Sequence, residues 1–251
     1  MNRLTQAVIM LLLGATVIKA TVTDTYLRYV KAGLGPYLLA AGILLAAAAL
    51  ATFWYEIRTA RNREAAQAHD HDDHGHDHEH DDGHGHGHGE TRVGWLLLLP
   101  ALAMLMISPP ALGSYSANQA GSVGLSAASD YPPLPDGDPV EVTLLDYASR
   151  ALFDSGKSLT GRNLKLTGFI TPGPDGSMML ARIVLTCCAA DGRPIKVGLT
   201  GVSMDAPADA WVQIEGVYST QVGTDPVNNA QIAYIEVRGW QEIDEPKQPY
   251  V

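Results

Sequence analysis

The order of apolar and polar positions divides this chain into two dissimilar halves. Long runs without charge occupy much of the first 113 residues, whereas short runs that alternate apolar and polar positions occupy the second half. Uncharged runs near 20 residues are typical of helices that cross a bilayer, and alternation with a period of two is typical of β-strands. The pattern predicts an α-helical membrane part followed by an all-β domain.

The first two apolar runs predict two membrane helices within residues 1–55. Residues 4–20 follow Arg3, so this run suits a retained signal anchor or a first span equally well. Residues 37–55 carry no charge, and aromatic residues stand at both ends, as they do at the two interfaces of a membrane. We therefore expect a multi-pass protein of the plasma membrane, with the lipid bilayer as its first partner.

A third apolar run, residues 93–113, predicts one further span. It contains Pro100, which a membrane helix tolerates where neighbouring groups satisfy the freed carbonyl. With the N-terminus inside, five basic residues near the span ends are cytoplasmic and three are outside: Arg3, Arg58, Arg61, Arg63 and Arg92 against Lys19, Arg28 and Lys31. This distribution favours an extracytoplasmic C-terminal domain and a cytoplasmic loop over residues 56–92.

That loop contains every histidine of the chain. They lie between Asp and Glu residues and glycines: His69, His71, His74, His76, His78, His80, His84, His86 and His88. Neutral imidazole suits Zn and other divalent transition metals, and the carboxylates add oxygen ligands. The tract therefore predicts weak metal binding at several sites, with a solvated low-complexity linker as the alternative.

The second half predicts a linker and then a small barrel. Residues 114–139 are rich in Ala, Ser, Gly and Pro, which is typical of a flexible tether. Residues 140–251 hold the β-domain, with strands expected at 140–145, 163–170, 178–188, 195–199, 211–218 and 230–237 and a helix at 146–153 that Asp146 caps. Gly168 and Gly216 fall inside strand patterns, where bulges bend a strand around a barrel corner. We expect an OB-like barrel, with an open β-sandwich as the alternative.

The composition argues against two classes of function. Basic residues of the β-domain are scattered among acids, so the domain lacks the basic and aromatic surface that binds nucleic acid. With all histidines in the loop, the β-domain cannot assemble a Ser-His-Asp triad, and we expect no enzyme.

Candidate chemistry in the β-domain lies at Cys187, Cys188 and Asp191. Neighbours in a strand point to opposite faces, but a turn at a strand end brings both thiols near Asp191. Three interpretations stay open: small core residues, thiolate ligands of a soft metal, or a redox pair that forms a vicinal disulfide.

The segment from Met179 to Pro194, with its Cys-Cys-x-x-Asp motif, resembles a bacterial family of two-component permease subunits. Members of that family are similar in having N-terminal spans, a polar linker and a C-terminal β-domain. The resemblance implies an accessory membrane subunit whose partner is a larger polytopic permease. A membrane-anchored protein that buffers or senses metal and a membrane-tethered thiol redox protein are the alternatives.

Overall fold

The computed structural model describes residues 3–67, 99, 103, 106–107, 110–128 and 130–251. The histidine tract and most of the expected third span lie outside these residues, so both stay predictions. The described chain forms two compact units, and the second unit contains Tyr26–Ala32 together with the residues from Pro110 onward.

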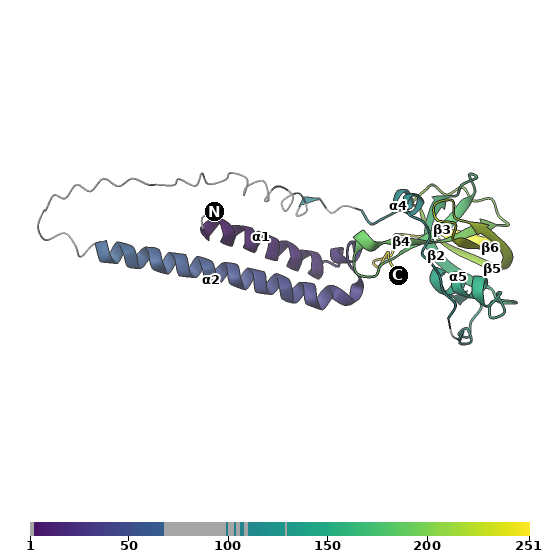
Figure 1. Ribbon diagram of the computed structural model, residues 1–251, viewed down its shortest axis with the longest axis horizontal. Helices are drawn as coiled ribbons and strands as arrows, with labels where there is room; N and C mark the ends of the chain where they lie inside the picture. The colour runs from purple at the N-terminus through teal and green to yellow at the C-terminus, as the bar shows by residue number, and fades with distance from the viewer. Residues whose placement is uncertain (1–2, 68–98, 100–102, 104–105, 108–109, 129) are drawn as a thin grey trace, which may run out of the picture. The chain divides into compact units, whose positions relative to one another are not determined.

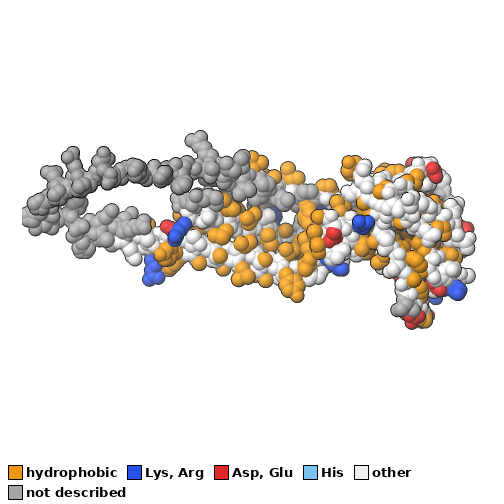
Figure 2. Space-filling view, viewed as in Figure 1, with side chains coloured by type: hydrophobic (Ala, Val, Ile, Leu, Met, Phe, Trp, Pro, Cys, Tyr) orange, Lys and Arg blue, Asp and Glu red, His pale blue; other side chains and the backbone are white. Residues whose placement is uncertain are grey.

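The first unit is a pair of helices, α1 (Arg3–Val22) and α2 (Gly35–Gln67) (Figure 1). The helices pack closely where glycines meet, since a Cβ on Gly14 would lie 2.9 Å from the carbonyl oxygen of Gly42. Small residues at such a crossing let two backbones approach, as in membrane helix pairs. Apolar side chains are spread over the side of the pair that Figure 2 shows, and both helices are long and apolar enough to cross a membrane.

Helix α2 is longer than the predicted 19-residue span. It continues to Gln67, so the first residues of the expected loop at 56–92 are helical. Residues 56–67 contain no glycine or proline and are rich in Ala, Arg and Glu, which are strong helix formers. Charge ends the membrane-compatible stretch, but it does not end the helix.

The second unit is a closed five-stranded barrel. Its strands follow the order β2-β3-β4-β6-β5, and β5 pairs with β2 to close the ring; the bounds are β2 Leu164–Pro172, β3 Met178–Val184, β4 Arg193–Thr200, β5 Trp211–Thr224 and β6 Gln231–Glu242. Neighbours are antiparallel except β4 and β6, which run parallel. This is an OB-like barrel, so that prediction is confirmed and the open sandwich is wrong, because closure leaves no free edge between β2 and β5.

One of the two predicted bulges is present. The register of β5 against β6 shifts between Glu215 and Gly216. Gly168 instead lies in a regular stretch, where a Cβ would come 2.6 Å from the carbonyl oxygen of Ala181. Gly168 is therefore required by close backbone approach rather than by a bulge.

A short helix, α5 (Leu144–Phe153), contributes to the barrel core (Figure 1). The strand predicted at 140–145 is only β1 (Val140–Glu141), because α5 begins early. Its cap is Thr143, whose side chain accepts a hydrogen bond from the N–H of Asp146, so the prediction that Asp146 caps the helix is wrong. Tyr147 projects from this helix and is fully buried, and its hydroxyl donates a hydrogen bond to the main-chain carbonyl of Tyr234 in β6.

The expected flexible tether is partly folded onto the barrel. Residues 114–119 form α4 (Ser114–Gln119), and Ala117 is fully buried. Further on, the N–H and hydroxyl of Ser122 both donate to the buried carboxylate of Asp225, which also pairs with Lys196 at 3.0 Å. Small side chains let this segment lie close to the barrel, where its backbone groups find partners. Its composition resembles a linker, but its contacts make it part of the domain.

Candidate functional site

The cysteine pair lies in a turn that follows β3. The strand predicted at 178–188 ends at Val184, and Leu185 is still buried. The chain then turns through Thr186–Cys188 into a short 3-10 helix, η4 (Ala189–Asp191), before β4 begins. Both thiols therefore stand beyond the regular strand, where side chains no longer alternate between faces.

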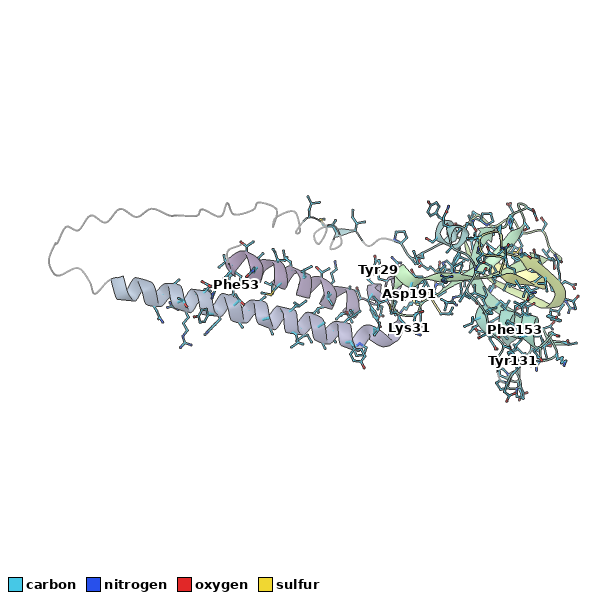
Figure 3. The ribbon with its side chains drawn as sticks, viewed as in Figure 1. Tyr29, Lys31, Phe53, Tyr131, Phe153 and Asp191 are labelled. Atoms are coloured by element: carbon cyan, nitrogen blue, oxygen red, sulfur yellow. The ribbon has the colours of Figure 1, made fainter. Side chains whose placement is uncertain are left out.

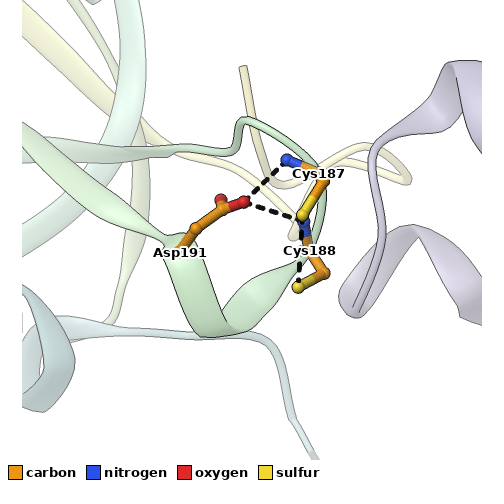
Figure 4. Close-up of side chains that lie close together, drawn as sticks. All are labelled: Cys187, Cys188 and Asp191. Atoms are coloured by element: carbon orange, nitrogen blue, oxygen red, sulfur yellow. Dashed lines mark hydrogen bonds between the residues drawn. The ribbon is translucent and has the colours of Figure 1, made fainter.

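The carboxylate of Asp191 holds this turn together. One oxygen accepts from the N–H of Thr186 at 2.8 Å. The other accepts from the N–H groups of Cys187 at 2.8 Å and Cys188 at 3.3 Å (Figure 4). The Cys187 thiol donates to the same carboxylate; this bond, and next the Thr186 N–H, lower the pKa of Asp191 to about 2 although burial acts in the opposite direction. Asp191 is therefore ionised at neutral pH.

The two thiols converge on the same side of that carboxylate. Their Sγ atoms lie 3.6 Å apart, and both cysteines are free (Figure 4). Each sulfur and a carboxylate oxygen of Asp191 all lie within 4.8 Å of one another. Cys187 is exposed and Cys188 is half-buried, so a metal ion or a reagent can reach the pair from solvent.

The Cys187 thiol is held in its protonated form. Its hydrogen bond to Asp191, and next its contact with Cys188, raise the pKa of Cys187 from 9.0 to about 11. A thiol with such a raised pKa is a weak nucleophile at neutral pH, because the thiolate is the reactive species. The same proton can be displaced by a metal ion that binds both sulfurs.

A shallow pocket of about 400 Å³ opens next to the site. Asp191 and Arg193 line it, together with residues of η4 and of the 120–121 segment. Asp191 therefore both accepts hydrogen bonds from the turn that carries the cysteines and lines this pocket.

The structure brings together the three residues that the sequence singled out. The interpretation as small core residues does not fit Cys187, which is exposed. The role of the three as ligands stays a prediction, as does metal binding by the histidines at 69–88. Sequence reasoning missed Thr186, whose N–H helps to fix Asp191, and the main chain of Val30 and Lys31, which contacts the turn. Nothing in the polar pattern of residues 21–31 signals that contact.

Comparison with known families assigns nearly the whole chain to two family domains. The DUF1980 N-terminal domain matches residues 5–123 and the DUF1980 C-terminal domain matches residues 142–251, so the chain carries both domains of the DUF1980 family. No curated protein and no solved structure matches it.

Proposed function

We propose that this protein is a membrane-anchored accessory subunit of a transport system, and that it binds a thiophilic transition-metal ion at Cys187, Cys188 and Asp191. The observation that carries the proposal is the convergence of two free thiols and an ionised carboxylate within 4.8 Å. A larger polytopic permease is the proposed partner, as the resemblance of the motif implies.

The spacing of the ligand atoms suits one ion. The sulfurs are 3.6 Å apart, close to the roughly 3.8 Å between two sulfurs in a tetrahedral zinc site with Zn–S of about 2.3 Å. Soft thiolates favour Zn or Cu(I), and the carboxylate adds a hard ligand that Zn accepts. We propose Zn or another thiophilic ion as cargo.

Three protein ligands favour exchange over permanent storage. Structural zinc sites are closed by four protein ligands, whereas sites with three leave one position open. An open position on an exposed turn permits an incoming or outgoing donor to take the ion. This is the property that a subunit needs if it delivers metal to a permease or receives metal from one.

The assignment of residues Tyr26–Ala32 to the barrel unit supports one arrangement of the spans. They connect α1 to α2 in the sequence but belong to the compact unit of the barrel. If both helices cross the bilayer, their connection and the barrel share one face, and the chain leaves α2 on the other. It then has to cross again before it reaches the barrel, and the proposed span is the apolar run within residues 93–113. The basic residues favour an extracytoplasmic barrel and a cytoplasmic histidine tract.

A thiol redox function is the weaker candidate. The closeness of the sulfurs favours it, but a redox or nucleophilic cysteine needs a lowered pKa, and the pKa of Cys187 is raised to about 11. Metal binding uses the same geometry without requiring a reactive thiolate in the free protein.

Cadmium absorption tests the metal site in the full chain. Thiolate-to-cadmium charge transfer absorbs in the ultraviolet and imidazole gives no such band, so cadmium bound to the histidine tract adds nothing to the signal. We expect one cysteine-dependent Cd(II) per chain, loss of the band in Cys187→Ser and Cys188→Ser, and retention in the neighbouring control Ala190→Ser. A wild-type chain without the band, or a double serine variant that keeps it, would sink the proposal.

Orientation is tested separately with single cysteines in a chain that lacks Cys187 and Cys188. An impermeant thiol reagent applied to intact cells should label a cysteine at Ser126 and leave one at Gly75 unlabelled. The reverse pattern would invert the proposed orientation.

A further inference from the structure

The segment Tyr26–Ala32, here called the interhelix segment, makes main-chain contacts with the turn Thr186–Cys188, here called the cysteine turn. Val30 pairs with Cys188 in an isolated antiparallel bridge. The N–H of Lys31 donates to the carbonyl of Cys187 at 3.0 Å, and the N–H of Ala189 donates to the carbonyl of Tyr29 at 2.7 Å. Figure 3 shows Tyr29 and Lys31 beside Asp191. Main-chain bonds therefore hold the turn on both sides of Cys188.

The C-terminal residues anchor the other end of the interhelix segment. The hydroxyl of Tyr250 donates to the carbonyl of Arg28 at 2.9 Å, and Arg28 pairs with Glu245 at 3.6 Å. The last residue, Val251, exchanges main-chain bonds with Ile183 and Leu185, just before the cysteine turn. Two segments remote in the sequence therefore contact the turn or the residues that lead into it.

We infer that metal occupancy of the Cys187–Cys188–Asp191 site and docking of the interhelix segment are coupled, so that the barrel reports metal loading to the connection between α1 and α2. The inference rests on the proposed function and names its regulation. It requires that the docked segment favour the arrangement of the turn in which the thiols converge.

The backbone conformation of Cys188 gives a physical reason why the docked segment favours converging thiols. Cys188 is extended, with φ −150° and ψ 170°, and neighbouring side chains on an extended strand point apart. The chain bends at Cys187, whose carbonyl accepts a hydrogen bond from the N–H of Lys31, and the two sulfurs lie 3.6 Å apart at this bend. Undocking releases that carbonyl together with the bridge to Cys188, and a less ordered turn binds an ion more weakly because ordering it costs free energy.

Coupling of this kind acts in both directions. If docking tightens metal binding by some factor, metal tightens docking by the same factor, and such factors are typically about 5- to 150-fold. The interhelix segment continues within four residues into α1, which ends at Val22, and into α2, which begins at Gly35. Metal loading therefore changes the order of the segment that joins the two helices, where a membrane partner can read it.

Two substitutions at one position test the inference in the full chain. Lys31→Pro removes the N–H that donates to Cys187, whereas Lys31→Ala keeps this N–H and removes only the side-chain charge. With Cd(II) as the probe, followed by its charge-transfer band in competition with a chelator, we expect Lys31→Pro to bind about 5- to 150-fold more weakly and Lys31→Ala to bind as wild type. Wild-type affinity in Lys31→Pro overturns the coupling.

Amide hydrogen exchange gives a readout that needs no substitution in the segment. Saturating Cd(II) should slow exchange at the Lys31 and Ala189 amides in the wild-type chain, but not in Cys187→Ser/Cys188→Ser, where the histidine tract is still present. Unchanged exchange in a chain that shows the cadmium band overturns the coupling alone. Absence of the band from the wild-type chain overturns the metal site and the coupling with it.

Discussion

Replacing Asp191 by asparagine tests how the carboxylate controls the thiol beside it. The hydrogen bond from Cys187 to Asp191 is the largest cause that raises the pKa of Cys187 from 9.0 to about 11. Asparagine keeps one carbonyl oxygen for the main-chain N–H groups of the turn but removes the negative charge. We therefore expect the pKa of Cys187 to fall back towards 9.0.

The expected change in reactivity follows from that pKa. A return from about 11 to 9.0 raises the thiolate fraction at neutral pH roughly 100-fold. A thiolate of lower pKa is also less nucleophilic. With a Brønsted slope of about 0.4–0.5, this divides the roughly 100-fold gain in rate by a factor of roughly 6 to 10. Because Cys187 is exposed, solvent screening reduces the gain further. Alkylation of Cys187 should therefore be about tenfold faster, or somewhat less, in Asp191→Asn.

The measurement is the rate of iodoacetamide alkylation near neutral pH, read by peptide mass spectrometry in a Cys188→Ala background. Asp175→Asn, at an exposed position in the turn between β2 and β3, is the matched control and should leave the rate unchanged. An Asp191→Asn chain that reacts at the wild-type rate or more slowly would show that the carboxylate does not hold the proton on Cys187.

Three further predictions concern the stability of the two folded units. Asp225→Asn leaves the buried ammonium of Lys196 without its carboxylate and should lower the free energy of unfolding by about 3–5 kcal/mol in chemical denaturation. Burial acts to raise the pKa of Asp225, but its hydrogen bonds outweigh burial and lower this pKa below 3.8. The stability that the Asp225 carboxylate contributes is therefore complete above pH 3.8 and is lost as pH falls through its lower pKa in the folded protein. Acid melting curves of wild type and Asp225→Asn should converge at that pH. Gly14→Ala should destabilise the helix pair by about 1–3 kcal/mol in detergent melts, whereas Gly33→Ala, with open space around it, should not. Tyr250→Phe removes the hydroxyl that joins two segments and should cost about 1–3 kcal/mol in the same melts, a loss that an unchanged melting temperature would contradict.

The sequence alone determined most of the local elements, although not all of their ends and caps. Apolar runs of sufficient length predicted α1 and the membrane-compatible part of α2, because helix length scales directly with residue number. Alternation predicted the barrel strands, because the pleat sends neighbouring side chains to opposite faces. The spacing of Asp191 after Cys188 also sufficed to suggest a shared turn, since three residues are enough for a side chain to reach back to the main chain.

Only the tertiary structure decided the relations that are remote in the sequence. Closure of the barrel depends on the pairing of β5 with β2, and strand patterns do not specify which edges meet. Residues 114–125 resemble a linker in composition, yet Ser122 is buried against Asp225, because packing overrides a weak local preference. The docking of Val30 and Lys31 on the cysteine turn is of the same kind: main-chain hydrogen bonds carry no side-chain signature, so only the folded chain reveals them.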